Sequence, residues 1–189
     1  MHNKKGTWIA WVSVILIVLL IIGIFFYFVL YSPRYDSFYM EKVNSGELVN
    51  PASGLSMDEA INQFDDEFVY YLLYTIKAYN LHNAPLNSDS PKMEIRVEDS
   101  IYNAEIVKGM IYVSGGGLAK KDIIISTSKE EGIKMLQNRD YVEQSFVDEK
   151  SGIEKVESQS VLFGKGYLNL YNELTGKSLT GNVVRIYAG

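Results

Sequence analysis

The sequence predicts an α+β fold, in which an N-terminal transmembrane helix is followed by a mostly antiparallel five-stranded sheet covered by helices. The first observation is a run without any charged residue at 7–31. The second is that the apolar period is helical over 57–81 and changes to two over 93–114. The third is the spacing of a helix-capping box at 56–59 and again at 128–131. Helices are therefore expected before and after this group of strands in the sequence.

The apolar run at 7–31 is long enough to cross a bilayer. A helix rises about 1.5 Å per residue, so this run exceeds the roughly 30 Å of a hydrocarbon core. Trp8 near one end and Tyr31 at the other have amphipathic rings that favour the headgroup level. A cleaved secretory signal has a shorter apolar region and small residues at its cleavage site, which this run lacks. We therefore expect an uncleaved signal anchor within residues 1–31.

The orientation of this anchor follows from the positive charges that flank it. Lys4, Lys5 and the free N-terminal amine precede the run, against Arg34 and Lys42 after it. Positive charge favours the cytoplasmic side of a membrane. The expected topology is single-pass, with a cytoplasmic N-terminus and the C-terminal domain outside the cytoplasm.

A second interpretation of the N-terminus is a resemblance. Lys4-Lys5-Gly6 directly before an apolar helix resembles the processing site of type IV pilin precursors. The resemblance implies cleavage after Gly6 and packing of the helix into a filament. Many bacterial members of that family carry a Glu where this chain has Trp11.

Composition indicates one domain beyond the anchor, at 56–189, joined by a linker at 32–55. All 23 acidic residues follow Tyr31, so residues 32–189 carry a net charge of −7, and they show no basic stripe. That balance argues against nucleic acid as a partner and against attachment to anionic lipid by charge. Cysteine is absent, which excludes disulfides and thiol catalysis. In the linker, Tyr35, Phe38 and Tyr39 are expected at the membrane interface, unless the anchor helix continues past Pro33 into water.

The domain is expected to alternate between helices and strands. A helix over 57–81, opened by Ser56 and Glu59, is apolar almost all round in its second half, so it should be covered on more than one side. The expected strands are an antiparallel meander at 93–97, 101–107 and 110–114, a buried strand at 122–127, a fifth strand at 166–171 and a possible edge strand at 182–187. Further helices are expected after the second capping box at 128–131, as two short helices within 140–163, and as one turn at 172–177.

The chemical motifs are incomplete. Gly176-Lys177-Ser178 matches the end of a phosphate-binding loop, but Tyr171 replaces its first glycine and no long helix can follow. The glycines at 115–117 fit a turn. The anchor separates His2 from His82, so the histidines cannot build a metal site or a catalytic triad. We expect neither an enzyme nor a metal or cofactor.

Three stretches, 93–113, 122–136 and 161–171, resemble the sterol carrier (non-specific lipid transfer) family in the order of their elements and residue classes. The resemblance covers about residues 57–178. It implies an apolar tunnel between sheet and helices, and lipid binding or transfer. The side chains that it implies as walls of the tunnel are Phe68, Leu72 and Ile76 on the long helix, Met135 on the short helix, and Leu162 and Phe163.

The expected function is therefore that of a membrane-anchored, non-enzymatic binding domain for an apolar ligand such as lipid. The alternative is a pilin-like or other assembly subunit, acting through a homo-oligomer or a membrane protein partner. The tyrosines at 70, 71, 74 and 79 fit both functions, because they can line a cavity or fill a solid core or an interface.

Overall fold

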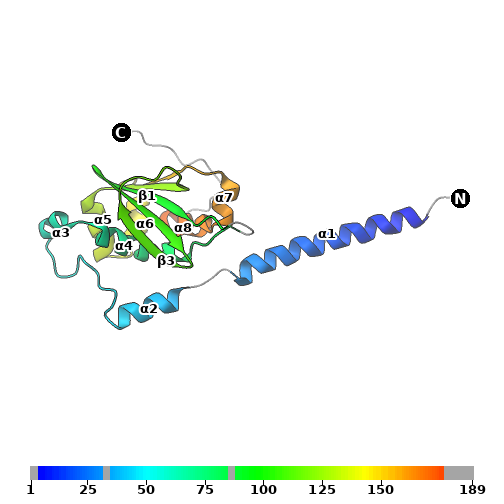
Figure 1. Cartoon of the computed structure of the whole chain (residues 1–189), viewed down its shortest axis with the longest axis horizontal. Coiled ribbons are helices and arrows are strands. Elements are labelled where there is room, and N and C mark those ends of the chain that lie inside the picture. The colour runs from blue at the N-terminus through cyan, green and yellow to red at the C-terminus, as the bar shows by residue number, and fades with distance from the viewer. Residues whose placement is uncertain (1–3, 32–34, 85–87, 177–189) are drawn as a thin grey trace. The chain divides into compact units, whose positions relative to one another are not determined.

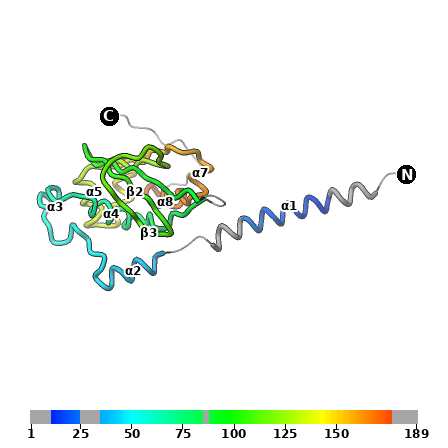
Figure 2. The backbone as a smooth tube through the Cα atoms, viewed as in Figure 1, coloured from blue at the N-terminus to red at the C-terminus, as the bar shows by residue number. Residues whose placement is uncertain are grey.

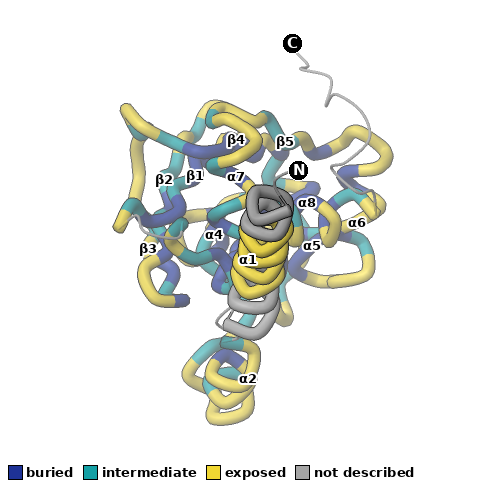
Figure 3. Tube along the Cα trace, turned by 90° about the vertical axis from the view of Figure 1, so that its right-hand side faces the viewer, coloured by how far each residue is buried: buried dark blue, intermediate teal, exposed yellow. Residues whose placement is uncertain are grey.

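The computed structural model describes residues 4–31, 35–84 and 88–176, which fall into two compact units divided after Pro33. The first unit holds one helix, α1 (Lys4–Tyr31; Figure 1). Its residues 11–24 are exposed, as the yellow part of the helix shows in Figure 3. Over the residues that the structure describes, no helix combines the length and the hydropathy needed to cross a membrane. The predicted transmembrane helix is thus not found.

The second unit is built on a five-stranded sheet with the order β3-β2-β1-β4-β5. Its strands are β1 (Lys92–Val97), β2 (Ser100–Val107), β3 (Met110–Gly115), β4 (Ile123–Thr127) and β5 (Gly152–Lys155). The predicted meander and the buried fourth strand are confirmed to within two residues. Neighbouring strands are antiparallel except β1 and β4, which are parallel. The sheet is therefore mixed, whereas the sequence predicted a mostly antiparallel one without identifying a parallel pair.

The parallel pair arises from the path of the chain between β3 and β4. After β3, at one edge of the sheet, the chain returns across β2 to the free side of β1. On the way, the Leu118 N–H donates a hydrogen bond to Glu94 Oε2 on β1, at 3.3 Å. The chain therefore enters β4 from the same end of the sheet as β1. Alternation of side chains predicts a strand but contains no information about its direction.

The predicted fifth strand at 166–171 is wrong, because these residues belong to the helix α8 (Tyr167–Thr175). Its buried side chains, Tyr167, Leu170, Tyr171 and Leu174, have the i, i+3, i+4, i+7 spacing of a helix face. The true fifth strand, β5, lies between α6 (Tyr141–Val147) and α7 (Gln159–Gly164). These are the two short helices expected within 140–163.

The expected long helix at 57–81 is broken into α3 (Met57–Gln63), α4 (Asp66–Thr75) and the 3-10 turn η1 (Ala78–Asn80). Ser56 and Glu59 form the predicted capping box. The Asp65 carboxylate then caps α4 by accepting a hydrogen bond from the Glu67 N–H at 3.0 Å. Lys77, with a left-handed φ of 57°, ends the helical stretch. The cap at Asp65 and the left-handed backbone at Lys77 therefore divide the continuous apolar pattern of 57–81 into separate helices.

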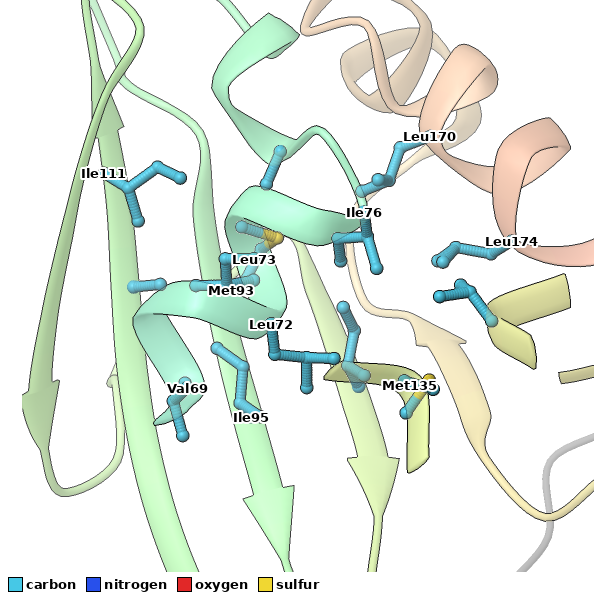
Figure 4. Packing of buried hydrophobic residues seen from close by; sticks show 14 of the residues in the cluster. Val69, Leu72, Leu73, Ile76, Met93, Ile95, Ile111, Met135, Leu170 and Leu174 are labelled. Atoms are coloured by element: carbon cyan, nitrogen blue, oxygen red, sulfur yellow. The ribbon is translucent and has the colours of Figure 1, made fainter. Parts of the chain in front are cut away.

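The helices α4, α5 (Lys129–Gln137), α6 and α8 gather on one face of the sheet (Figures 2 and 3). The close-up shows α4 lying over the strands, with α8 beside it (Figure 4). The side chains that meet there include Leu72 and Leu73 of α4, Ile76 directly after α4, Met93 and Ile95 of β1, and Leu170 and Leu174 of α8. The core of the domain is thus a single apolar layer between sheet and helices.

The segment 32–55, expected as a linker, contributes α2 (Asp36–Asn44) and part of the core. Tyr39 of α2 is completely buried and Ala52 almost so. The predicted edge strand at 182–187, and the last two residues of the phosphate-loop-like motif, lie outside the described residues.

Candidate ligand-binding region

Five of the six side chains implied as tunnel walls lie in the core, and the sixth does not. Phe68 and Leu72 of α4, Ile76 directly after α4, Met135 of α5 and Leu162 of α7 are each at most 3% exposed and belong to one apolar cluster. Phe163 of α7 points away from that cluster and is 58% exposed. The structure therefore brings together residues from three helices that are widely separated in the sequence.

A glycine allows the helices to approach closely at this cluster. A Cβ at Gly132 of α5 would lie 3.3 Å from Cε2 of Phe64, at the end of α3. The Phe64 ring in turn stacks on Phe68 of α4, with ring centroids 5.1 Å apart. The glycine hence lets α5 close over the aromatic pair. Gly132 of α5 therefore packs against Phe64, and Phe64 packs against Phe68 of α4.

A buried cation lies beside the cluster, which the sequence did not predict. Lys165 is 1% exposed, and its ammonium group donates to Asp122 Oδ1 at 2.8 Å, to the Ser90 carbonyl oxygen at 3.0 Å and to Asp89 Oδ2 at 3.1 Å. The Tyr167 hydroxyl donates to Asp122 Oδ2 at 3.0 Å. Burial, followed by the Asp122 charge, raises the pKa of Tyr167. All three protons of Lys165 are bonded, so this group holds the fold together and is not poised for proton transfer.

A second polar network joins α5 to α6. The Glu131 carboxylate accepts hydrogen bonds from the Tyr141 hydroxyl at 2.9 Å and from the Ser145 hydroxyl at 3.1 Å. Burial raises the pKa of Glu131, but the hydrogen bonds from Lys134, Tyr141 and Ser145 outweigh it and lower the pKa overall. Half of the predicted second capping box is confirmed, since the Ser128 hydroxyl accepts from the Glu131 N–H. The Glu131 carboxylate does not complete the box, because it accepts hydrogen bonds from Tyr141 and Ser145 instead.

One solvent-exposed pocket, of 240 Å³, lies between the end of α2 and the start of α4. Its lining combines Leu48, Val49, Tyr70 and Tyr71 with the charged side chains of Lys42, Glu47 and Glu67. Lys42 and Glu47 form an ion pair at 2.6 Å. The volume is below the range of about 300–1,000 Å³ that small-molecule sites occupy. None of the six predicted wall residues lines this pocket.

Catalytic and metal chemistry have few candidate groups in the described part of the chain. No group of three or more His, Cys, Asp or Glu that could hold a metal is found there. The Nδ1 of His82 lies 3.0 Å from the neighbouring Asn83 carbonyl oxygen. His2 lies outside the described residues.

Comparison with known proteins yields neighbours in structure only. No family model and no curated protein sequence matches the chain. A sec-alkylsulfatase from Pseudomonas sp. matches with a TM-score of 0.33 and 12% identity, over 60% of this chain but only 16% of the alkylsulfatase.

Sterol carrier proteins are among the other structural neighbours. Sterol carrier protein 2 like 2 of Aedes aegypti matches with a TM-score of 0.30 and 14% identity, over 47% of this chain and 86% of its own. Sterol carrier protein 2 of Yarrowia lipolytica matches with a TM-score of 0.30 and 10% identity, over 64% of this chain and 88% of its own. The predicted resemblance to the sterol carrier family is thus present among the solved structures, as a weak likeness of fold. Likenesses at these values carry no argument about ligand or activity.

Proposed function

We propose that the chain is a membrane-anchored, non-enzymatic domain that binds an apolar ligand such as lipid between its sheet and its helical layer. The observation that carries the proposal is the convergence of Leu72 of α4, Met135 of α5 and Leu162 of α7 on one apolar cluster. The two polar networks beside it have their hydrogen-bonding groups paired. The cluster therefore offers apolar contact without a group for chemistry.

Binding there requires the helices to part, because the five buried wall residues pack against other core side chains. A bound acyl chain would offset this cost, since each buried CH₂ contributes about 0.8 kcal/mol. The short helix α7 is the element at which the layer can open. It has only six residues and presents Leu162 to the core and Phe163 to solvent.

The anchor is the second component of the proposal, and its support is the charge-free run at 7–31 within the 28 residues of α1. As a helix, this charge-free run of 25 residues would measure about 38 Å, longer than the roughly 30 Å hydrocarbon core of a bilayer. Carbonate extraction of membranes tests the anchor, which should stay in the pellet. Ile17→Arg should impair insertion by roughly 2.5 kcal/mol or more, whereas Ile17→Leu should not. Release of the unchanged chain into the supernatant would refute the anchor.

Photo-crosslinking of the full chain with a diazirine fatty acid tests the ligand. Adducts that map to peptides of α4, α5 or α7 would support binding in the domain, whereas adducts confined to α1 would report only surrounding lipid. Leu72→Phe should reduce the domain adducts by filling space at the cluster, with circular dichroism as the check on folding. Phe163→Leu, at an exposed position, is the matched control. Failure to find domain adducts would refute ligand binding.

The alternative function, an assembly subunit, is favoured by the edge strand β3. This strand has no charged residue from Met110 to Gly115, and Tyr112 on it is 57% exposed. Such an edge can accept a strand from another chain. Tyr112→Lys should then dissociate oligomers seen by sedimentation, whereas Glu154→Lys on the opposite edge strand β5 should not. A chain that is monomeric before any substitution would refute this alternative.

A further inference from the structure

Both ends of the segment that contains α7 are fixed to one residue, Asp122. Before α7, the Val156 N–H and the Glu157 N–H both donate to the Asp122 carbonyl oxygen, at 2.9 and 3.0 Å. After α7, the Lys165 ammonium group donates to Asp122 Oδ1 at 2.8 Å. Asp122 itself is 1% exposed and lies directly before β4. Residues 158–164 therefore form a loop that is closed on one buried residue.

One buried side chain holds this loop, residues 158–164, on the core. Leu162 is 2% exposed, and it is the buried residue of α7. The hydrogen bonds of the loop stay inside it or reach the next two residues, as from the Leu162 N–H to the Ser158 carbonyl oxygen at 3.0 Å. Within the described residues, none connects the loop to the sheet or to another helix. Leu162 is therefore the contact that keeps the loop on the apolar cluster.

The neighbouring helices have more contacts that hold them in place. The Glu131 carboxylate of α5 accepts hydrogen bonds from Tyr141 and Ser145 of α6. The buried side chains of α8 are Tyr167, Leu170, Tyr171 and Leu174. By contrast, α7 has only six residues, and a helix of that length is not stable alone in water. Of these helices, α7 is therefore the one that loses its structure most readily once Leu162 leaves the cluster.

We propose that the loop at 158–164 is a lid, which turns outward on its two attachments to Asp122 and admits the apolar ligand to the cluster. This inference rests on the ligand binding of the proposed function. Because the Lys165 ion pair and the two backbone hydrogen bonds to Asp122 stay in place, the loop moves without breaking any contact of the sheet. The lid then closes over the bound chain, which gives Leu162 a new apolar contact and slows the next opening.

Hydrogen exchange of the full chain in phosphatidylcholine vesicles measures the opening of the lid. An opened α7 loses its helical hydrogen bonds, so a peptide that covers 158–164 should exchange at least about tenfold faster than one that covers 167–175. Addition of oleate should slow exchange at 158–164 and leave 167–175 unchanged. Equal exchange of the two peptides without oleate, or no effect of oleate on 158–164, would overturn the inference.

Leu162→Ala removes the contact that closes the lid. It should speed both exchange at 158–164 and the formation of diazirine fatty acid adducts in α4 and α5, followed by photolysis at increasing times after mixing, by at least about tenfold. Leu174→Ala is the matched control, because it truncates a fully buried leucine of the same cluster on α8 and should leave both rates unchanged. Circular dichroism checks the folding of both variants. Equal adduct rates in the two variants would overturn the lid and leave the ligand intact, whereas a lack of adducts in α4 and α5 in every chain would refute both.

Discussion

The Nζ atom of Lys165 lies 2.8 Å from Oδ1 of Asp122, and both side chains are at most 2% exposed. The lysine belongs to the connection between α7 and α8, and the aspartate immediately precedes β4. Asp122 Oδ2 also accepts a hydrogen bond from the Lys92 N–H at the start of β1, at 2.7 Å. The ion pair therefore fastens the last helices to the two central, parallel strands.

Removing the cation should destabilise the domain strongly. Lys165→Met leaves the Asp122 charge buried with only the Lys92 N–H and the Tyr167 hydroxyl as donors, which should cost about 3–5 kcal/mol. Urea unfolding of the domain beginning at Arg34 measures the loss. Lys77→Met is the control, because its ion pair with Glu173 is 33% and 42% exposed and should contribute at most about 1 kcal/mol. Equal effects of the two substitutions would contradict the structural role of the buried pair.

The stability of the domain should fall in acid through Asp89. Hydrogen bonds from Lys120 and Lys165 hold the pKa of Asp89 well below its usual range. The folded state therefore favours the carboxylate, so the stabilisation is complete above the unfolded pKa of about 4 and is lost progressively below it. Asp89→Asn should lower stability at neutral pH and flatten the decline below about pH 4. Urea midpoints at a series of pH values measure both, and an unchanged slope would contradict this assignment.

The sequence predicted those parts of the fold that depend on local patterns. The strands of the meander alternate along their length, and Ser56 with Glu59 opens a helix by direct side-chain contact. The prediction of a strand at 166–171 was wrong, although Leu168 and Leu170 alternate there with the polar Asn169. Tyr171 and Leu174 complete a helical stripe in the same stretch. The strand direction of β4 could not be read, because it depends on the route of the chain across the sheet.

For the candidate site, five of the six predicted wall residues lie in one buried cluster and Phe163 is exposed, and a role of any of them in lining a ligand tunnel stays a prediction. Leu162 and Phe163 are equally apolar neighbours, and only the orientation of α7 distinguishes them. The burial of Lys165 was also not predictable, because its acceptors come from segments more than 40 residues away. Tyr39 was expected at the membrane interface but is buried against Tyr79. Nothing within 32–55 indicates this contact, because Tyr79 lies 40 residues further along the chain.

A core substitution should distinguish the packed interior from the exposed wall residue. Leu72→Ala removes a side chain that is 3% exposed and should cost about 2–5 kcal/mol. Phe163→Ala removes a side chain that is 58% exposed and should change stability by about 0.5 kcal/mol or less. Thermal and urea unfolding measure both. A cost below about 1 kcal/mol for Leu72→Ala would indicate that the cluster already contains a cavity at this position.

The folded domain should begin at Arg34 and not at the end of the expected linker. A chain beginning at Arg34 keeps α2, whereas one beginning at Gly54 loses Tyr39 and Ala52 from the core and exposes Tyr79. We expect both to be soluble, with the longer chain unfolding cooperatively and the shorter one less stable by about 3–5 kcal/mol, the cost of removing a large buried aromatic.

Tyr39→Phe in the longer chain separates the contributions of α2. It keeps the stacking on Tyr79 and removes the hydrogen bond to the Gly109 carbonyl, so it should cost about 1–3 kcal/mol. Urea unfolding followed by tyrosine fluorescence measures the three chains under the same conditions. Equal stability of the chains beginning at Arg34 and Gly54 would mean that α2 is not part of the folding unit.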